Sequence, residues 1–122
     1  MATASLGSIL LGTTDPDRLR GWYLEAFAPK ENSNGFLDFG GFQVLIDGRD
    51  DLGPASPEPA RVILNFHVDD ARALAAHLTS LGTRWLVEIE ERENGLFGTL
   101  TDPDGNYLQL IELDQAYLDS QS

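Results

Sequence analysis

The sequence predicts an α+β fold in which one structural plan occurs twice along 122 residues. Two short apolar stretches, Ser8–Asp15 and Ile63–Asp70, both end in aspartate and both lead directly into a segment with helical periodicity. Each helical segment is followed by extended segments, not by another helix, and residues typical of turns separate them. We therefore expect a strand, a helix and then antiparallel strands in each half.

The first half contains a predicted helix that begins after Asp15. Asp15 is a good N-cap, and Pro16 suits the first helical turn, where a missing N–H costs nothing. Apolar residues then recur at the spacing of one helix face, at Leu19, Trp22, Tyr23 and Ala26. Extended segments follow over Gly35–Phe39 and Phe42–Ile46, joined by a turn at Gly40 and Gly41.

The second half repeats this order with longer strands. Asp69 or Asp70 caps a helix that ends at Gly82 and whose predicted sheet-facing residues are Leu74, His77, Leu78 and Leu81. Predicted strands follow over Trp85–Ile89, Leu96–Leu100 and Tyr107–Leu113. The segment Thr101–Asn106 joins the last two strands as a turn, because Pro103 has a preset φ and Gly105 tolerates a positive one.

The chain is predicted to be a single domain of two modules, residues 5–47 and 61–113. A linker rich in Asp, Gly and Pro occupies residues 48–60, and residues 114–122 form a C-terminal tail. Apolar residues make up 42% of the chain, which is enough for a packed core.

Charge and composition restrict the classes of binding partner and the expected cellular location. Eight Lys and Arg residues against twenty Asp and Glu residues give a net charge of −12. This charge disfavours nucleic acid and anionic membranes and favours a basic small molecule. The absence of Cys excludes disulfides and thiolate chemistry. With no apolar run long enough for a membrane helix and no basic secretory leader, we expect a cytoplasmic protein.

Three segments together carry a family resemblance: Thr14–Leu19 followed by Trp22 and Tyr23, then Phe66–Asp70, then Thr101–Asn106 leading into Tyr107–Glu112. In this order and spacing, over about residues 5–113, the chain resembles the vicinal oxygen chelate superfamily of glyoxalases, bleomycin-resistance proteins and extradiol dioxygenases. The resemblance implies two βαβββ modules that form a curved mixed sheet with a concave ligand cleft. It also implies a homodimer.

Side chains alternate between the two faces of a strand, so each strand can be assigned a helix side and a cleft side. Ile9, Leu11, Leu64 and Phe66 should pack under the helices, as should Leu108 and Leu110. Aromatic side chains on the cleft side would stack an aromatic or cationic ligand. The predicted ligand-binding residues are Ser8, Phe42, Val44, Ile63, Asn65, His67, Trp85, Phe97, Tyr107 and Gln109.

The resemblance also implies where a metal would bind. Metal-dependent members of the superfamily place His, Glu or sometimes Gln at one position on each of four strands, and these positions fall here on Ser8, Val44, Ile63 and Gln109. Val44 and Ile63 have no lone pair to donate, and a serine hydroxyl is a poor ligand. We therefore expect no catalytic metal and no cofactor.

The leading hypothesis is a metal-independent protein, similar to bleomycin-resistance proteins, that sequesters a basic or aromatic antibiotic or metabolite. The alternative is a lyase or isomerase of the same superfamily that uses His67 as general base, since the unperturbed pKa of an imidazole, about 6.5, suits proton transfer. A third hypothesis is a metalloenzyme with rearranged ligands, in which His67 acts with a carboxylate from the acidic run Glu88–Glu93.

Overall fold

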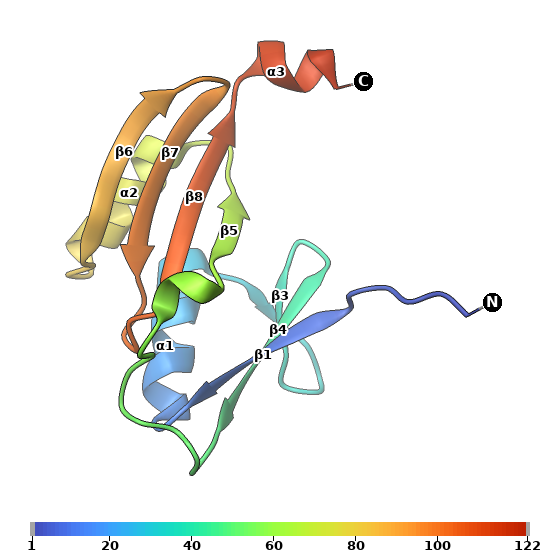
Figure 1. The fold of residues 1–122 in the computed structure, drawn as a ribbon, viewed down its shortest axis with the longest axis vertical. Helices are drawn as coiled ribbons and strands as arrows, with labels where there is room; N and C mark the ends of the chain where they lie inside the picture. Colours follow the sequence, from blue (N-terminus) through green and yellow to red (C-terminus); the bar gives the residue numbers. More distant parts are fainter. Residues whose placement is uncertain (1, 122) are drawn as a thin grey trace. The chain divides into compact units, whose positions relative to one another are not determined.

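The predicted α+β class is confirmed, and the βαβββ plan occurs twice (Figure 1). The structure is a computed structural model that describes residues 2–121. The chain separates into two compact units, Met1–Pro54 and Ala55–Ser122, with a boundary inside the predicted linker. None of the helices within residues 2–121 combines the length and the apolarity needed to cross a membrane.

The first unit is a four-stranded mixed sheet with one helix. Its elements are β1 (Ser8–Thr13), α1 (Pro16–Phe27), β2 (Lys30–Glu31), β3 (Leu37–Phe39) and β4 (Phe42–Gly48). The strand order is β1-β4-β3-β2, with β1 parallel to β4 and the other pairs antiparallel. Asp15 caps α1 as predicted, accepting a hydrogen bond from the backbone N–H of Arg18 at 3.2 Å. Leu19, Tyr23 and Ala26 are the buried residues of α1.

The second unit repeats the arrangement with longer strands. Its elements are η1 (Pro59–Arg61), β5 (Leu64–His67), α2 (Ala71–Ser80), β6 (Trp85–Arg92), β7 (Gly95–Thr101), β8 (Tyr107–Leu113) and α3 (Gln115–Ser120). The strand order is β5-β8-β7-β6, and α2 lies against one face of this sheet (Figure 1). The predicted C-terminal tail thus contains a short helix.

Helix α2 begins and ends as predicted but presents a different stripe to the sheet. Asp70 accepts a hydrogen bond from the backbone N–H of Ala73 at 3.0 Å, and Glu112 of β8 accepts one from Ala71 at 2.7 Å. The more buried residues of the helix are Ala71, Leu74, Ala75 and Leu78, which share one helix face. The prediction that His77 packs against the sheet is wrong, because its side chain is exposed.

The turn between β7 and β8 is fixed by Asp102, which is only 4% exposed. One carboxylate oxygen accepts hydrogen bonds from the backbone N–H groups of Asp104 and Asn106, at 2.9 and 3.0 Å. The other accepts from the Asn106 side-chain amide at 2.9 Å, and Gly105 has a φ of 83°. This turn sets Tyr107 opposite Thr101 and so fixes which side chains each face of the sheet presents.

Candidate functional site on the open sheet faces

The candidate site is the face of each sheet that lies opposite the helix of its own unit. We call these open face 1, on the β1-β4-β3-β2 sheet, and open face 2, on the β5-β8-β7-β6 sheet. Residues paired across neighbouring strands point to the same side of a sheet, so the register assigns each side chain to a face. Glu112 of β8 accepts a hydrogen bond from α2, so Leu108 and Leu110, four and two residues before it on the strand, are on the helix side as predicted.

Open face 2 carries a row of neutral polar groups in its middle. Asn65 of β5 pairs with Gln109 of β8, which pairs with Thr99 of β7, which pairs with Val87 of β6. No hydrogen bond joins the Asn65, Gln109 or Thr99 side chains to any other residue of the chain between positions 2 and 121. Amide and hydroxyl groups are therefore available here to a ligand.

Apolar and aromatic side chains flank this polar row. On one side, Tyr107 pairs with Thr101. Ile63, which is 41% exposed, immediately precedes Leu64, the partner of Leu108. On the other side, His67, Ile111, Phe97 and Glu90 form a row across all four strands. Of the predicted binding residues, the second unit thus brings Asn65, His67, Phe97, Tyr107 and Gln109 onto one face.

Two charged residues at the edge of open face 2, Glu90 and Arg92, belong to the acidic run Glu88–Glu93 and were not among the predicted ligand-binding residues. The guanidinium carbon of Arg92 lies over the Phe97 ring, 5.8 Å from its centroid. The same guanidinium forms an ion pair with Glu90 at 2.7 Å, and both side chains are about half exposed. A sequence signal exists, since Glu90 and Arg92 alternate on one strand, but an acidic run of this kind is also typical of a solvated strand end.

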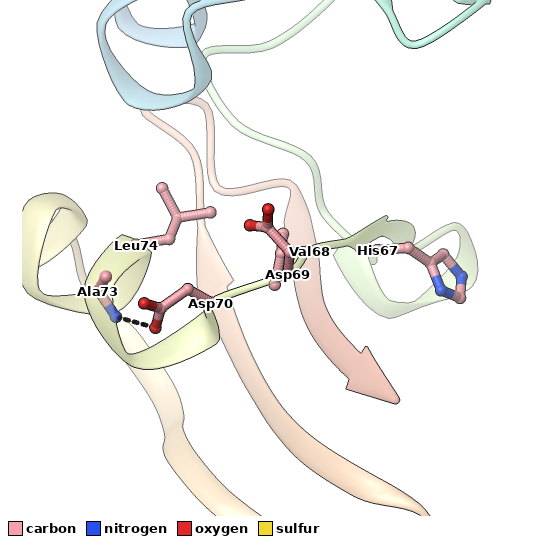
Figure 2. A pocket seen from close by; sticks show the side chains of 6 residues that line it. All are labelled: His67, Val68, Asp69, Asp70, Ala73 and Leu74. Carbon is pink, nitrogen blue, oxygen red and sulfur yellow. Dashed lines mark hydrogen bonds between the residues drawn. The ribbon is translucent and has the colours of Figure 1, made fainter. Parts of the chain in front are cut away.

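His67 is exposed and stands apart from the nearest carboxylates. An open hollow at the start of α2 is lined by His67, Val68, Asp69, Asp70, Ala73 and Leu74. Figure 2 shows the imidazole pointing away from Asp69 and Asp70. The Asp70 carboxylate accepts a hydrogen bond from the backbone N–H of Ala73. Neither carboxylate therefore orients the imidazole as a catalytic dyad would require.

Open face 1 differs from its predicted composition because β4 is shifted by one residue. Val44 pairs with Ile9 of β1 and Leu37 of β3, and it is only 4% exposed. Phe42 pairs with Phe39, whose ring contacts two aromatic rings of α1. The prediction that Phe42 and Val44 face the cleft is therefore wrong. Both are on the helix side, and so is Ile46, two residues beyond Val44.

The side chains that do belong to open face 1 are less suited to a ligand. Ser8 pairs with Gln43, Leu10 with Leu45 and Gly12 with Asp47. A Cβ at Gly12 would lie 2.8 Å from the Arg49 side chain, so Arg49 covers this end of the face. Arg49 also donates to Asp51 at 2.6 Å, and this hydrogen bond lowers the pKa of the Asp51 carboxyl.

Trp85 is another residue whose predicted face is wrong. Its indole N–H donates to the Thr79 hydroxyl of α2 at 3.0 Å, so the ring lies on the helix side. Gly98 leaves the space for it, because a Cβ there would meet Ile89 at 2.7 Å and Trp85 at 3.3 Å. The register shifts twice along β6, which breaks the simple alternation on which the prediction depended.

The corrected register changes one of the four positions at which a metal-dependent relative would hold its ion. Val44 of β4 occupies the place that the buried Leu108 has in β8, so the residue equivalent to Gln109 is Leu45. The four positions are then Ser8, Leu45, Ile63 and Gln109. Leucine and isoleucine offer no donor, so this set does not fit a divalent cation.

Rearranged ligands do not restore a metal site within either unit. His67 is on β5 and the acidic run is on β6, at opposite edges of the same sheet. Three strand spacings of about 4.8 Å separate them by about 14 Å, too far to share one ion. Within each unit, residues 2–121 contain no cluster of three or more His, Asp or Glu side chains that could hold a metal.

The glyoxalase-like domain family matches residues 8–111, and the chain belongs to this family. The resemblance to the vicinal oxygen chelate superfamily is thereby confirmed. No curated protein sequence matches the chain.

Solved structures with the same fold are distant in sequence. A glyoxalase/bleomycin resistance protein/dioxygenase family enzyme from Burkholderia phytofirmans is 17% identical with a TM-score of 0.76, covering 91% of this chain and all of that one. The fosfomycin resistance protein FosX from Listeria monocytogenes is 16% identical with a TM-score of 0.74, covering 94% and 98%. A related domain from Frankia is 20% identical with a TM-score of 0.70, covering 93% and 99%.

Proposed function

We propose that the protein is a metal-independent small-molecule-binding member of the glyoxalase-like family that sequesters a basic or aromatic ligand. The observation that carries this proposal is the hydrocarbon at Leu45 and Ile63, two of the four positions that a chelating relative would fill with donors. A protein that only sequesters its ligand needs no group to stabilise a transition state.

Open face 2 supplies the binding groups in this proposal. Phe97 and Tyr107 offer ring faces for stacking, and Asn65, Gln109 and Thr99 offer neutral hydrogen-bonding groups between them. The net charge of −12 raises the local concentration of a basic ligand. An antibiotic is one such ligand, and this chain shares its fold with the fosfomycin resistance protein FosX.

Elemental analysis of the purified protein tests the metal argument. We expect no stoichiometric transition metal, and dialysis against Mn²⁺, Ni²⁺, Zn²⁺ or Fe²⁺ should leave the melting temperature unchanged. Bound metal at one equivalent per chain would overturn the proposal.

A thermal-shift screen of cationic and aromatic antibiotics tests the binding argument. A ligand should raise the melting temperature of the wild-type protein and of Phe42→Leu, which changes a ring on the helix side of the other sheet. The rise should be smaller for Phe97→Leu, because that change removes a stacking surface. The proposal is wrong if no compound raises the melting temperature.

Catalysis by His67 is the second candidate, since this imidazole is exposed on open face 2 in the same row as Phe97. In a lyase or isomerase that uses His67 as base, His67→Ala should lower kcat/KM by about 10²–10⁴-fold. His77→Ala, which changes the other exposed histidine on α2, is the control. Equal turnover by the wild-type protein, His67→Ala and His77→Ala would exclude His67 as the base.

We further propose that the protein works in the cytoplasm as a homodimer, the assembly that the family resemblance implies. Sedimentation equilibrium should give about twice the 13.4 kDa chain mass. A single species at the monomer mass would refute this part of the proposal without affecting ligand binding to open face 2.

A further inference from the structure

Phe97 and Glu90 on open face 2 together have the chemistry of a subsite for an organic cation. An aromatic face attracts a cation within about 6 Å of its centroid, and a neighbouring carboxylate adds a charge-assisted hydrogen bond. Both groups are already engaged by the guanidinium of Arg92, which is 5.8 Å from the Phe97 centroid and 2.7 Å from a Glu90 oxygen.

The contact between Arg92 and this subsite is suited to exchange. The Arg92 and Glu90 side chains are 45% and 49% exposed, so water screens their attraction. An exposed pair of this kind adds little to the stability of the fold, and its guanidinium can move into solvent when another cation takes its place.

We propose that Arg92 is a specificity-determining residue that occupies a cation subsite formed by Phe97 and Glu90 until the cationic group of the ligand displaces it. This inference rests on the proposed function and assigns the class of ligand: an organic cation such as an amidine, guanidine or alkylammonium. Arg92 then acts as an internal competitor that rejects molecules without such a group.

The register adds a second feature of the ligand. Thr99 lies two residues beyond Phe97 on β7, about 7 Å along the strand, and pairs with Gln109. The ligand should therefore carry a neutral hydrogen-bonding group about 7 Å from its cationic group. An anion that used Arg92 as its partner would have to break the Glu90 pair and approach a chain of net charge −12.

The test compares three probes that share one ring and differ in charge: benzamidine, benzamide and benzoate. Dissociation constants are measured by NMR titration for the wild-type protein, Arg92→Gln and Arg92→Lys. Arg61→Gln is the matched control, because it makes the same change in charge and also breaks an exposed pair, with Glu58 at 3.0 Å.

We expect Arg92→Gln to bind benzamidine about two- to fivefold more tightly than wild type, since it loses the internal competitor. Arg92→Lys should fall between them and Arg61→Gln should match wild type. Benzamide should also bind Arg92→Gln more tightly than wild type, because the guanidinium that excludes it from the Phe97 ring is absent. The NMR signals whose chemical shifts change on ligand addition should include those of Phe97, Thr99 and Gln109. Phe97→Leu combined with Arg92→Gln should remove the gain.

Three results would overturn the inference, and they separate it from the proposed function. Equal benzamidine affinity in wild type and Arg92→Gln would remove the competitor role and leave ligand binding intact. Benzoate binding that depends on Arg92 would replace the cation class by an anion class. The absence of shifts on open face 2 with every probe and every variant would overturn the proposed function as well.

Discussion

Replacing Val44 and Leu45 separately with glutamate tests the register of β4, which decides which of these two residues is on open face 1. The two residues are adjacent and apolar, but Val44 is 4% exposed beneath α1 whereas Leu45 is half-buried on open face 1. A glutamate at Val44 would be buried without a partner. A glutamate at Leu45 would reach water at the open face.

The expected difference in the free energy of unfolding is large. Val44→Glu loses about 1.5–3 kcal/mol of apolar burial. Keeping the buried carboxyl neutral at pH 7 costs about 3.7 kcal/mol more, from a pKa of about 4.3 and 1.36 kcal/mol per pH unit. The sum, about 5–7 kcal/mol, is comparable with the whole stability of a small domain. Leu45→Glu should cost about 1 kcal/mol, because only part of its surface is buried.

The destabilisation caused by Val44→Glu should depend on pH, whereas a loss of packing alone would not. Burial raises the pKa of the folded-state glutamic acid above its unfolded value, so the penalty grows as the pH rises above the unfolded pKa of about 4.3. The penalty of Val44→Glu should therefore shrink between pH 7 and pH 4.5. Val44→Gln, which does not titrate, is the control.

Urea unfolding followed by circular dichroism measures these differences as shifts in the transition midpoint at constant m value. At pH 7, Val44→Glu should be unfolded or nearly so, and Leu45→Glu should unfold close to wild type. The reverse order would show that Val44 faces the open side and that β4 has the opposite register.

The remaining predictions concern single contacts. Asp102→Ala should lower the free energy of unfolding by about 2–4 kcal/mol, since three hydrogen bonds to a buried carboxylate are lost, and an unchanged denaturation midpoint would contradict this. Gly95→Ala should destabilise the fold more than Gly98→Ala in thermal melts. At Gly95 a Cβ would overlap the backbone oxygen of Glu112, whereas at Gly98 the closest atom, at 2.7 Å, is a side-chain methyl that can rotate. His67→Ala should change the free energy of unfolding by less than about 0.5 kcal/mol, because the side chain is exposed. Any effect of this change on ligand affinity or turnover can then be assigned to the site.

The sequence was sufficient to predict the order of helices and strands. It was also sufficient to assign the faces of strands in which apolar and polar residues alternate clearly. In β5, apolar Leu64 and Phe66 alternate with polar Asn65 and His67, which fixes the phase of the strand. The caps of both helices were predictable for the same local reason, because an aspartate bonds the backbone N–H three residues later.

The errors arose where local pattern does not determine phase. Val44, Leu45 and Ile46 are all apolar, so alternation cannot say which of them faces the helix. Matching Phe42 to Tyr107 gives the wrong phase, because the two turns that precede these residues differ in length. In α2, alanines occur on more than one face of the helix, so they do not mark the buried face. Ala71 was therefore not recognised as a sheet-facing residue. Trp85 was misplaced because its position depends on Gly98, a residue in another strand.

The two copies of the plan have diverged in what their open faces offer. On open face 1, Leu10 and Leu45 contribute hydrocarbon, Gln43 accepts a hydrogen bond from Asn32, and the Arg49 side chain covers Gly12. On open face 2, neutral polar groups lie between aromatic rings. The neutral polar and aromatic groups on which the proposed function depends therefore belong to the second copy, whereas hydrocarbon side chains occur in both copies, at Leu45 in the first and Ile63 in the second.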